Sequence, residues 1–438
     1  MKNILLLFAD WLIILGSILL SFSILNDVML VDYQANLGAF YFILPIIITI
    51  YSFLTYVFGL YNVSRQSLQE LVYIIFLISV SLTTAIMAVC FLVREAALAY
   101  PRSVILLSAC FYFIFLFIWR AILWKMEKMH HGRIPVMVIG YNTDDLLKSL
   151  RKIHKDIYDI KFVFNGNEKD VLENISLVSE VFLGSEISLS VRSNIILSAL
   201  ENEVVINFVP KYDDIGLINA SLLITDDIPT FRISKMVLTP DELFVKRIFD
   251  LFFATLGIIV FSPIMLIVAI LVKMDGGSIF YSQERLTLGS KVFNLRKFRT
   301  MVCDAEKLSG PVFAGENDPR ITPLGRILRA TRLDEFPQMF NILKGDMSIV
   351  GPRPERPFFV EQFENEIPEY RARLKVKAGL TGLAQVFGKY NTQAKEKLRY
   401  DLIYISKYSL FQDFIIVLQT VKILFLKSST EGVKAEAN

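Results

Sequence analysis

The fold is decided by one apolar stretch, R-I-F-D-L-F-F-A-T-L-G-I-I-V-F-S-P-I-M-L-I-V-A-I-L-V-K, which runs from Arg247 to Lys273. It is long enough to cross a bilayer, for which about 20 apolar residues in a helix suffice. Ser262-Pro263 lies in its middle, where proline removes a helix hydrogen bond and bends the helix. Lys246-Arg247 precede the run and a basic segment follows it, so both flanks favour the cytoplasmic side.

A helix that enters the membrane, bends and leaves by the same face satisfies both observations. Such a break is tolerated where other protein covers it. We therefore expect a re-entrant helix over about residues 245–273, with Ser262 and Pro263 as the membrane break. The alternative is a true crossing, which would export everything after Lys273.

Four further apolar segments precede residue 130, and hydrophobic residues make up 54% of the chain. They are Ile4–Leu25, Gly38–Tyr61, Leu68–Val93 and Ser103–Trp124. Each is long enough to span a bilayer as a helix. Lys125, Lys128 and Arg133 place the end of the fourth segment in the cytoplasm, and four crossings then return the N-terminus to the same side.

The region between the fourth apolar segment and Arg247 has a different residue pattern. Short β-rich runs such as P-V-M-V-I, K-F-V-F, V-F-L-G-S and V-V-I-N-F-V-P alternate there with helical segments. This alternation predicts a small Rossmann-like α/β domain with a parallel sheet. A single glycine, Gly140, follows the first strand and falls short of G-x-G-x-x-G, so a structural or regulatory use is favoured over dinucleotide binding.

Composition excludes several classes of function. The formal net charge is only +3, so no basic field points to nucleic acid. The three cysteines lack the paired spacing of a disulfide framework or a metal knuckle, and the three histidines lack ligand spacing.

After Lys273 the chain becomes basic. We expect two strands, Ile279–Glu284 and Val292–Phe298, joined by a turn around Gly289-Ser290. Cationic side chains follow at Arg296, Lys297, Arg299, Arg320, Arg326, Arg329, Arg332 and Arg353. Guanidinium groups suit phosphate recognition, whereas a run of charge by itself usually means a solvated or headgroup-facing surface.

Two adjacent carboxylates, Asp334 and Glu335, occur in L-D-E-F-P-Q-M-F-N-I-L-K-G-D-M-S-I-V-G-P-R-P. Either could cap a helix that has Pro337 in its first turn. The basic residues on both sides of the pair and the bent apolar segment before it favour a catalytic role. A carboxylate can attack phosphorus while its neighbour holds Mg²⁺ together with substrate phosphates. The G-P-R-P turn holds Arg353 rigidly, and arginine neutralises charge on a transferring phosphoryl group. The pattern predicts phosphoryl transfer beside a membrane.

The motifs Q-E-R, K-F-R-T-M, L-D-E-x-P-Q-x-x-N-I-L-K-G-D-M-S-I-V-G-P-R-P and the Ser-Pro in the apolar run resemble those of the bacterial sugar transferase family. Its members are the monotopic polyprenyl phosphate phosphoglycosyl transferases. The resemblance of the catalytic part covers about Phe244 to Tyr408, and Phe336 stands where leucine is common. The N-terminal spans and the α/β domain are similar to those of large members, such as the undecaprenyl-phosphate galactose or glucose phosphotransferases.

The resemblance implies a reaction and roles for named residues. Asp334 would attack the β-phosphate of a UDP-sugar, release UMP and hold the phosphosugar covalently. Undecaprenyl phosphate would then take the phosphosugar and restore Asp334, while Glu335 binds Mg²⁺. Arg329 and Arg353 would contact phosphates, with Lys297 and Arg299 as helpers. This would be the first membrane step of exopolysaccharide, capsule or O-antigen synthesis.

The expected fold class is a membrane protein of the α plus α/β type. Four transmembrane helices (1–130) precede the Rossmann-like domain (131–238) and a C-terminal α/β catalytic domain with the re-entrant helix (239–438). The resemblance implies a multi-pass protein of the bacterial inner membrane with a cytoplasmic catalytic domain. The apolar and α/β portions also offer surface for a homodimer.

Two other functions fit the same residues. One is a glycosyltransferase that moves only the sugar and leaves UDP rather than UMP. The other is a non-enzymatic membrane sensor or scaffold that uses its α/β domain to bind a regulator.

Overall fold

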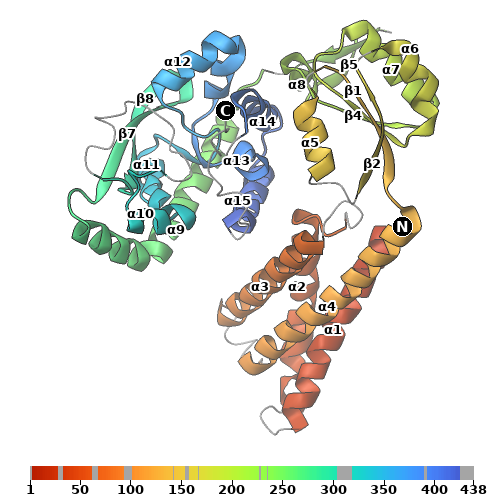
Figure 1. Cartoon of the computed structure of the whole chain (residues 1–438). Helices are drawn as coiled ribbons and strands as arrows, with labels where there is room; N and C mark the ends of the chain where they lie inside the picture. The colour runs from red at the N-terminus through yellow and green to blue at the C-terminus, as the bar shows by residue number, and fades with distance from the viewer. Residues whose placement is uncertain are drawn as a thin grey trace. The chain divides into compact units, whose positions relative to one another are not determined.

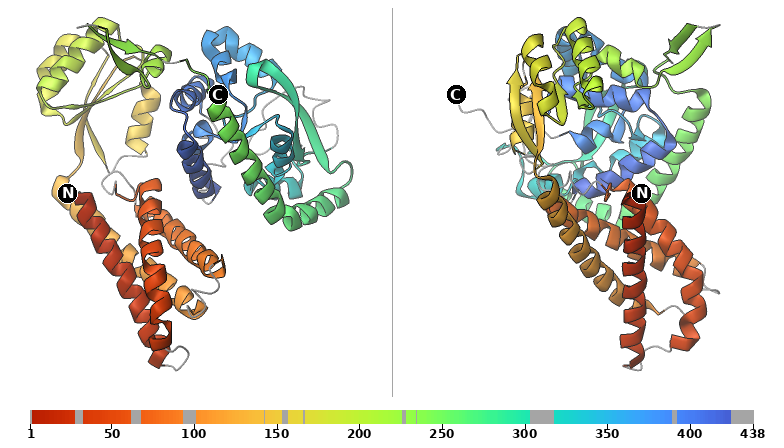
Figure 2. Two further views of the ribbon diagram at one scale, coloured as in Figure 1. Left: turned by 180° about the vertical axis from the view of Figure 1, so that it is seen from behind. Right: turned by 90° about the vertical axis from the view of Figure 1, so that its right-hand side faces the viewer.

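The computed structural model describes residues 2–27, 33–61, 68–92, 101–141, 143–152, 157–165, 167–225, 228–233, 235–302, 318–388 and 392–424. Contacts within the chain divide it into two compact units, Met1–Val209 and Pro210–Asn438. Their elements are labelled in Figure 1 and seen from two further sides in Figure 2.

The predicted N-terminal apolar segments form long helices. These are α1 (Lys2–Asp27), α2 (Tyr33–Val57), α3 (Leu68–Leu92) and α4 (Arg102–His131). Helix α1 packs on α4, α4 on α3 and α3 on α2. Together with α9 (Pro240–Met274), they are the five helices in the described part of the chain that are long and apolar enough to cross a membrane.

A buried ion pair joins the first and last helices of this bundle. Arg120 on α4 donates to the Asp10 carboxylate on α1, and both side chains are fully buried. The Tyr51 hydroxyl on α2 donates to the same carboxylate at 2.9 Å. Charged groups inside a membrane bundle are costly unless they are paired, so these contacts fix how three helices meet.

The predicted parallel sheet is confirmed in the same unit. It has the strand order β2-β1-β3-β4, and every neighbouring pair is parallel. Its elements are β1 (Ile134–Ile139), α5 (Asp144–Lys152), β2 (Tyr158–Phe164), α6 (Glu168–Asn174), β3 (Glu180–Leu183), α7 (Leu189–Glu201) and β4 (Val205–Phe208), with a 3₁₀ turn at Ile175–Leu177. Helices α6 and α7 lie on one side of the sheet (Figure 1). Gly140 has a φ of 131°, and a Cβ there would lie 3.3 Å from the Gly184 backbone, so tight packing explains this glycine.

In its described residues, the second unit is mostly helical and has three two-stranded sheets. It contains α8 (Tyr212–Leu217), β5 (Ser221–Thr225), β6 (Ile228–Arg232), α9, β7 (Phe280–Thr287), β8 (Lys291–Phe298), α10 (Pro323–Ala330), α11 (Gln338–Lys344), β9 (Ser348–Val350), α12 (Pro357–Glu366), β10 (Gly379–Thr381), α13 (Leu383–Phe387), α14 (Ala394–Ser406) and α15 (Leu410–Leu424). Short 3₁₀ segments lie at η3 (Leu288–Ser290), η4 (Leu333–Glu335) and η5 (Pro368–Lys375). The β7–β8 hairpin confirms the two predicted strands and their turn.

The described residues between 210 and 238 belong to the second compact unit. Ile215 on α8 and Leu238 belong to its hydrophobic core, which also includes residues of β7, β9 and α14. The Ser406 hydroxyl donates to the Ile215 carbonyl at 3.3 Å. Helix α8 is therefore part of the C-terminal unit's core.

Helix α9 shows why serine precedes the proline. Pro263 has no N–H for the carbonyl of Ile259, four residues earlier, and the Ser262 hydroxyl donates to that carbonyl at 2.9 Å. An unbonded carbonyl is costly in an apolar environment, so Ser262 makes the interruption tolerable. The ribbon of α9 bends along its length (Figure 2).

Both halves of α9 pack on the same unit. Near its start, Lys246 pairs with Asp413 of α15 at 2.5 Å, and Arg247 donates to the Ile342 and Leu343 carbonyls of α11 at 2.7 and 2.8 Å. These two cations, predicted to flank a membrane, are thus used in protein contacts. Beyond the proline, Met265, Val268 and Val272 form a separate core with Phe298 and Leu328.

Candidate active site

The carboxylate pair lies on η4, a tight turn between α10 and α11. Helix α10 starts at a Thr322 cap, and its Gly325 lies so close to the Thr300 carbonyl that a Cβ there would come within 2.1 Å. After α10, Arg332 adopts a left-handed conformation (φ 54°) that turns the chain into Asp334 and Glu335. The capping role considered for these acids is wrong, because α11 begins after Pro337 and no side chain caps it.

Two contacts hold this turn against α9. The rings of Phe336 and Phe261 lie 4.6 Å apart between centroids, and Phe261 directly precedes Ser262-Pro263. On the next turn of α9 toward its start, Gly257 faces Met339 of α11, whose sulfur would lie 2.8 Å from a Cβ at that glycine. The break in the apolar helix and the carboxylate pair are therefore neighbours.

Glu335 forms ion pairs with two of the predicted cationic residues. Its Oε1 accepts from Lys297 Nζ of β8 at 2.8 Å and from Arg353 Nη2 of the G-P-R-P segment at 3.1 Å. The Glu335 side chain is 13% exposed, whereas Arg353 is 44% exposed and so accessible to a ligand. Three chain segments far apart in the sequence thus meet at one carboxylate oxygen.

The two acids differ in acid strength. Burial raises the pKa of Asp334 to about 6 against the opposing effect of Lys297, and the neighbouring Glu335 charge adds to the rise. Burial would also raise the pKa of Glu335, but Lys297 and Arg353 outweigh it and hold that pKa well below its usual range. The described residues give Asp334 no hydrogen-bond donor, and its side chain is 7% exposed. Glu335 is thus a fixed anion, and Asp334 is a buried, more basic carboxylate.

The two other residues predicted to bind phosphate, Arg329 and Arg299, make different contacts. Arg329 Nε donates to the Thr300 hydroxyl at 3.0 Å, which orients its guanidinium at the end of α10. Arg299 instead donates to the carbonyls of Val272 and Ser278, both at 3.0 Å, and to Gly276, so it holds the end of α9. A role for Arg299 with phosphate stays a prediction.

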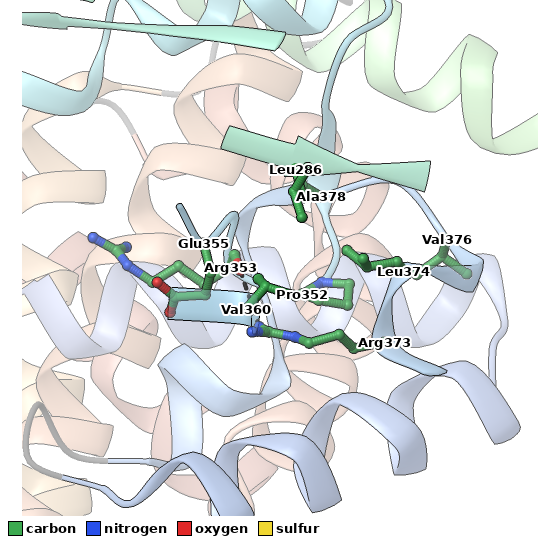
Figure 3. A pocket seen from close by; sticks show the side chains of 9 residues that line it. All are labelled: Leu286, Pro352, Arg353, Glu355, Val360, Arg373, Leu374, Val376 and Ala378. Carbon is green, nitrogen blue, oxygen red and sulfur yellow. Dashed lines mark hydrogen bonds between the residues drawn. The ribbon is translucent and has the colours of Figure 1, made fainter. Parts of the chain in front are cut away.

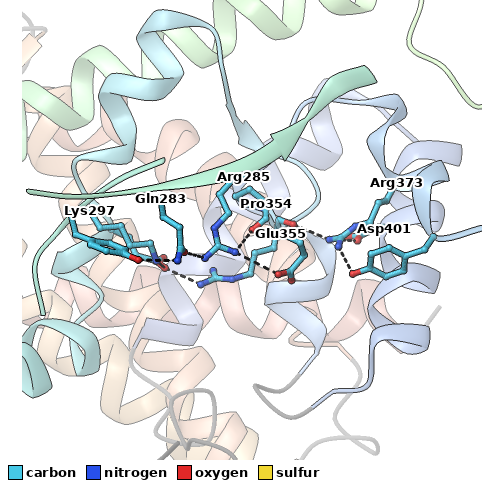
Figure 4. Close-up of polar contacts among 11 residues, drawn as sticks. Gln283, Arg285, Lys297, Pro354, Glu355, Arg373 and Asp401 are labelled. Carbon is cyan, nitrogen blue, oxygen red and sulfur yellow. Dashed lines mark hydrogen bonds and ion pairs between the residues drawn. The ribbon is translucent and has the colours of Figure 1, made fainter. Parts of the chain in front are cut away.

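The structure adds residues that the sequence reasoning did not single out. A small polar cleft next to Glu335 is lined by Arg285, Leu295, Lys297, Glu335, Gln338, Arg353, Pro354 and Gly379. Arg285, which lines this cleft, donates to Gln283 and pairs with Glu355 at 3.7 Å, and farther along Arg373 pairs with Asp401 at 2.8 Å (Figure 4). Arg285 belongs to the Q-E-R motif and could have been flagged there, while nothing local in the sequence marks Arg373 or Asp401.

The carboxylates of this site suit a metal ion that binds together with the substrate phosphates. The described residues contain no group of three or more His, Cys, Asp or Glu side chains that could hold a metal by themselves. Mg²⁺ is commonly bound by one or two carboxylates together with substrate phosphates and water. The ionised Glu335 carboxylate offers one such ligand, since only its Oε1 is engaged by Lys297 and Arg353.

Known proteins share this C-terminal unit. The profile of the family described as "Bacterial sugar transferase" matches residues 241–427. An Aeromonas hydrophila protein, "UDP-N-acetylgalactosamine-undecaprenyl-phosphate N-acetylgalactosaminephosphotransferase", is 40% identical over 195 residues, which are 44% of this chain but 46% of that protein. The Caulobacter vibrioides "UDP-glucose:undecaprenyl-phosphate glucose-1-phosphate transferase" is 42% identical over 40% of this chain and 68% of its own length.

A third relative reaches beyond the C-terminal unit. The "Galactosyl transferase CpsE" of Streptococcus agalactiae serotype III is 31% identical over 336 residues, which cover 69% of this chain and 74% of that protein. The shared part therefore includes sequence N-terminal to the carboxylate-bearing unit. This chain belongs to the bacterial sugar transferase family.

Proposed function

We propose that this protein transfers a sugar 1-phosphate from a UDP-sugar to undecaprenyl phosphate, releasing UMP and forming undecaprenyl-diphosphate-sugar. The observation that carries the proposal is the buried carboxylate of Asp334 beside Glu335. Glu335 forms ion pairs with Lys297 and Arg353. A carboxylate nucleophile and nearby cations are what phosphoryl transfer requires. The names of the relatives from A. hydrophila and C. vibrioides support the same reaction.

The reaction would proceed in two displacements at one phosphorus atom. In the first, an Asp334 oxygen attacks the β-phosphorus, the bond to the bridging oxygen breaks, and UMP leaves with that oxygen. The product is an acyl phosphate that joins Asp334 to the sugar phosphate. In the second, an oxygen of undecaprenyl phosphate attacks the same phosphorus and frees the Asp334 carboxylate. With a pKa of about 6, this carboxylate is mostly ionised at neutral pH and ready to attack.

The surrounding residues would bind and orient the diphosphate. The half-exposed Arg353 is available to a phosphate oxygen, and Arg329 is oriented by Thr300. Lys297 would share its charge between Glu335 and the substrate. Glu335 would hold Mg²⁺, which when bound would neutralise charge on the diphosphate.

We further propose that α9 is re-entrant and that the C-terminal unit works on the cytoplasmic face of a bacterial inner membrane. Support comes from contacts at both ends of the helix. Lys246 and Arg247 tie its start to α15 and α11, and Arg299 ties its end. A helix whose two ends pack on one folded unit suits a bend within the membrane better than a crossing. There the protein would start exopolysaccharide, capsule or O-antigen synthesis.

Nucleotide release tests the reaction. Membranes that contain the protein should be incubated with undecaprenyl phosphate, Mg²⁺ and UDP-galactose, UDP-glucose or an N-acetylated UDP-sugar in turn. We expect UMP from at least one sugar nucleotide and none after chelation of Mg²⁺. Release of UDP would instead support a sugar-only glycosyltransferase, and no nucleotide release at all would support a sensor or scaffold.

Capture of the intermediate tests the nucleophile. With a UDP-sugar labelled at the β-phosphate and no lipid acceptor, the protein should acquire label, and Asp334→Asn should acquire none. Turnover by Asp334→Asn should fall on the order of 10³-fold or more. Asp346→Asn is a matched control, because Asp346 is also 7% exposed but lies outside η4. A labelled Asp334→Asn protein would refute the assignment.

A further inference from the structure

The segment that carries Arg353 is held in an unusual way. Pro352 and Pro354 flank this arginine and have no N–H, so the backbone of the segment can be fixed mainly through its carbonyls. All four carbonyls from Pro352 to Glu355 accept a hydrogen bond. The donors are Gly379 N–H at 2.9 Å, Arg373 Nη2 at 2.9 Å, Arg285 Nη1 at 3.2 Å and Leu286 N–H at 3.0 Å, in chain order of the acceptors.

Arg373 is the buried member of this set. It is 2% exposed, it pairs with Asp401 of α14 at 2.8 Å, and its Nη1 donates to the Tyr370 hydroxyl at 2.6 Å. In Figure 3 the Arg373 side chain extends along Pro352 toward the backbone of Arg353. Asp401 itself is 1% exposed, so the pair lies inside the protein.

Stability alone does not explain the buried Arg373–Asp401 ion pair. A buried ion pair often contributes no more to stability than well-packed apolar side chains of the same size, because both charges lose their hydration. What an apolar pair cannot provide is a donor at a fixed place for the Arg353 carbonyl. The guanidinium of Arg353, in turn, must reach both Glu335 and a substrate phosphate.

We propose that Arg373 and Asp401 are positioning residues that act through Arg353. Arg373 fixes the Arg353 carbonyl, Asp401 and Tyr370 fix Arg373, and the arginine at the tip of the segment is thereby aimed at the phosphate beside Glu335. The inference rests on the proposed phosphosugar transfer. Misplacement of a binding group by about 1 Å can cost on the order of 100-fold in rate.

A double-mutant cycle in the full-length chain tests the coupling. Arg373→Met should lower kcat for UMP release on the order of 10- to 100-fold when Arg353 is present, and by less than about 2-fold in an Arg353→Ala background. Asp401→Asn, which keeps the shape of the side chain, should act in the same direction. A purely structural role would give equal losses in both backgrounds and would overturn the proposal.

The control lies two residues away. Arg371 pairs with Glu364 at 2.6 Å on the surface, where its side chain is 48% exposed. Arg371→Met should therefore leave kcat unchanged. A loss of kcat in this control equal to that of Arg373→Met would also count against positioning.

A second measurement does not depend on activity. Amide hydrogen exchange of the peptide that contains Gly351, Arg353 and Glu355 should be faster in Arg373→Met than in the parent protein, and unchanged in Arg353→Ala. Unchanged exchange in Arg373→Met would show that the carbonyl is not held by this residue. If the parent protein releases no UMP from any UDP-sugar, the proposed function fails, while the exchange result still decides whether Arg373 holds the segment.

Discussion

At the scale of the residue, the adjacent acids Asp334 and Glu335 are separated in acid strength by their surroundings. Lys297 and Arg353 are bonded to Glu335 and favour its charged form, whereas burial dominates at Asp334 and disfavours charge there. A fixed anion and a more basic neighbour are the division of labour that a metal ligand and a nucleophile require. The sequence predicted that these two acids have different roles, but it contained no information on which cations meet which acid.

The raised pKa of Asp334 predicts a cost in stability. The folded value of about 6 exceeds the ordinary 3.8, so the folded state loses stability as pH rises from about 4 to above 6. Asp334→Asn removes the charge, so at pH 8 it should be more stable than the parent by about 1–3 kcal/mol, with the difference nearly gone at pH 4. Thermal unfolding in detergent at both pH values measures this.

Glu335→Gln provides the opposite control, because it weakens the contacts with Lys297 and Arg353 and should lower stability at pH 8. If Asp334→Asn were less stable than the parent at pH 8, the raised pKa would be wrong.

At the scale of the element, three glycines allow two chain segments to approach each other closely. A Cβ on Gly379 would lie 2.1 Å from the Gly351 nitrogen, and one on Gly382 would lie 2.1 Å from the Gly351 carbonyl oxygen. Strands β9 and β10 pair in parallel here, and Arg353 follows β9 by three residues. Backbone atoms cannot move aside as side chains do, so this contact requires glycine.

Gly379→Ala should therefore destabilise the protein by about 3 kcal/mol or more and reduce UMP release with it. Gly216→Ala in helix α8 is the matched control in the same unit, because a Cβ at Gly216 would meet only Ile233, at a distance of 3.9 Å. There alanine should be neutral or stabilising by up to about 1 kcal/mol. Thermal unfolding of both variants decides the matter, and equal stability of the two would contradict the close approach.

If helix α9 is re-entrant, its two ends lie on the same side of the membrane. In a protein without Cys90, Cys110 and Cys303, single cysteines placed next to Arg247 and Lys273 should react with an impermeant reagent from the same side of the membrane. Pro263→Ala restores an N–H for the Ile259 carbonyl and should favour a straight helix, which increases labelling of one end from the opposite side. Opposite-side labelling in the parent protein would establish a crossing instead.

Ser262→Ala is the control for this change. It removes the hydroxyl that bonds to the Ile259 carbonyl but leaves the proline in place. The bend should persist, so labelling should stay on one side while the amount of folded protein falls.

At the scale of the whole molecule, the boundary of the C-terminal unit matters. The core of this unit uses Ile215 and Leu238, and Thr239 caps α9 by accepting from the Glu242 N–H at 3.3 Å. A fragment that begins at Leu243 lacks all three features, whereas one that begins at Pro210 keeps them. The part of the chain that matches the family profile, 241–427, is thus not the whole folded unit.

We expect fragment 210–438 to release UMP in membranes, and fragment 243–438 to be less stable by several kcal/mol because its core loses two buried aliphatic side chains. Thermal unfolding and UMP release per folded protein compare the two. Equal stability would mean that α8 is dispensable. An inactive but folded fragment 210–438 would mean that the reaction needs the N-terminal unit.

The sequence by itself determined the apolar helices, the parallel sheet, the β7–β8 hairpin and the presence of a carboxylate pair among arginines. These follow from periodicity and composition, which act between residues near one another in the chain. Only the tertiary structure decided that Lys297 and Arg353 meet on Glu335, that Lys246 is buried against Asp413, and that Arg373 holds the Arg353 carbonyl. Such contacts join segments 18 to 167 residues apart. Their geometry depends on how the core packs, which no local pattern of residues records.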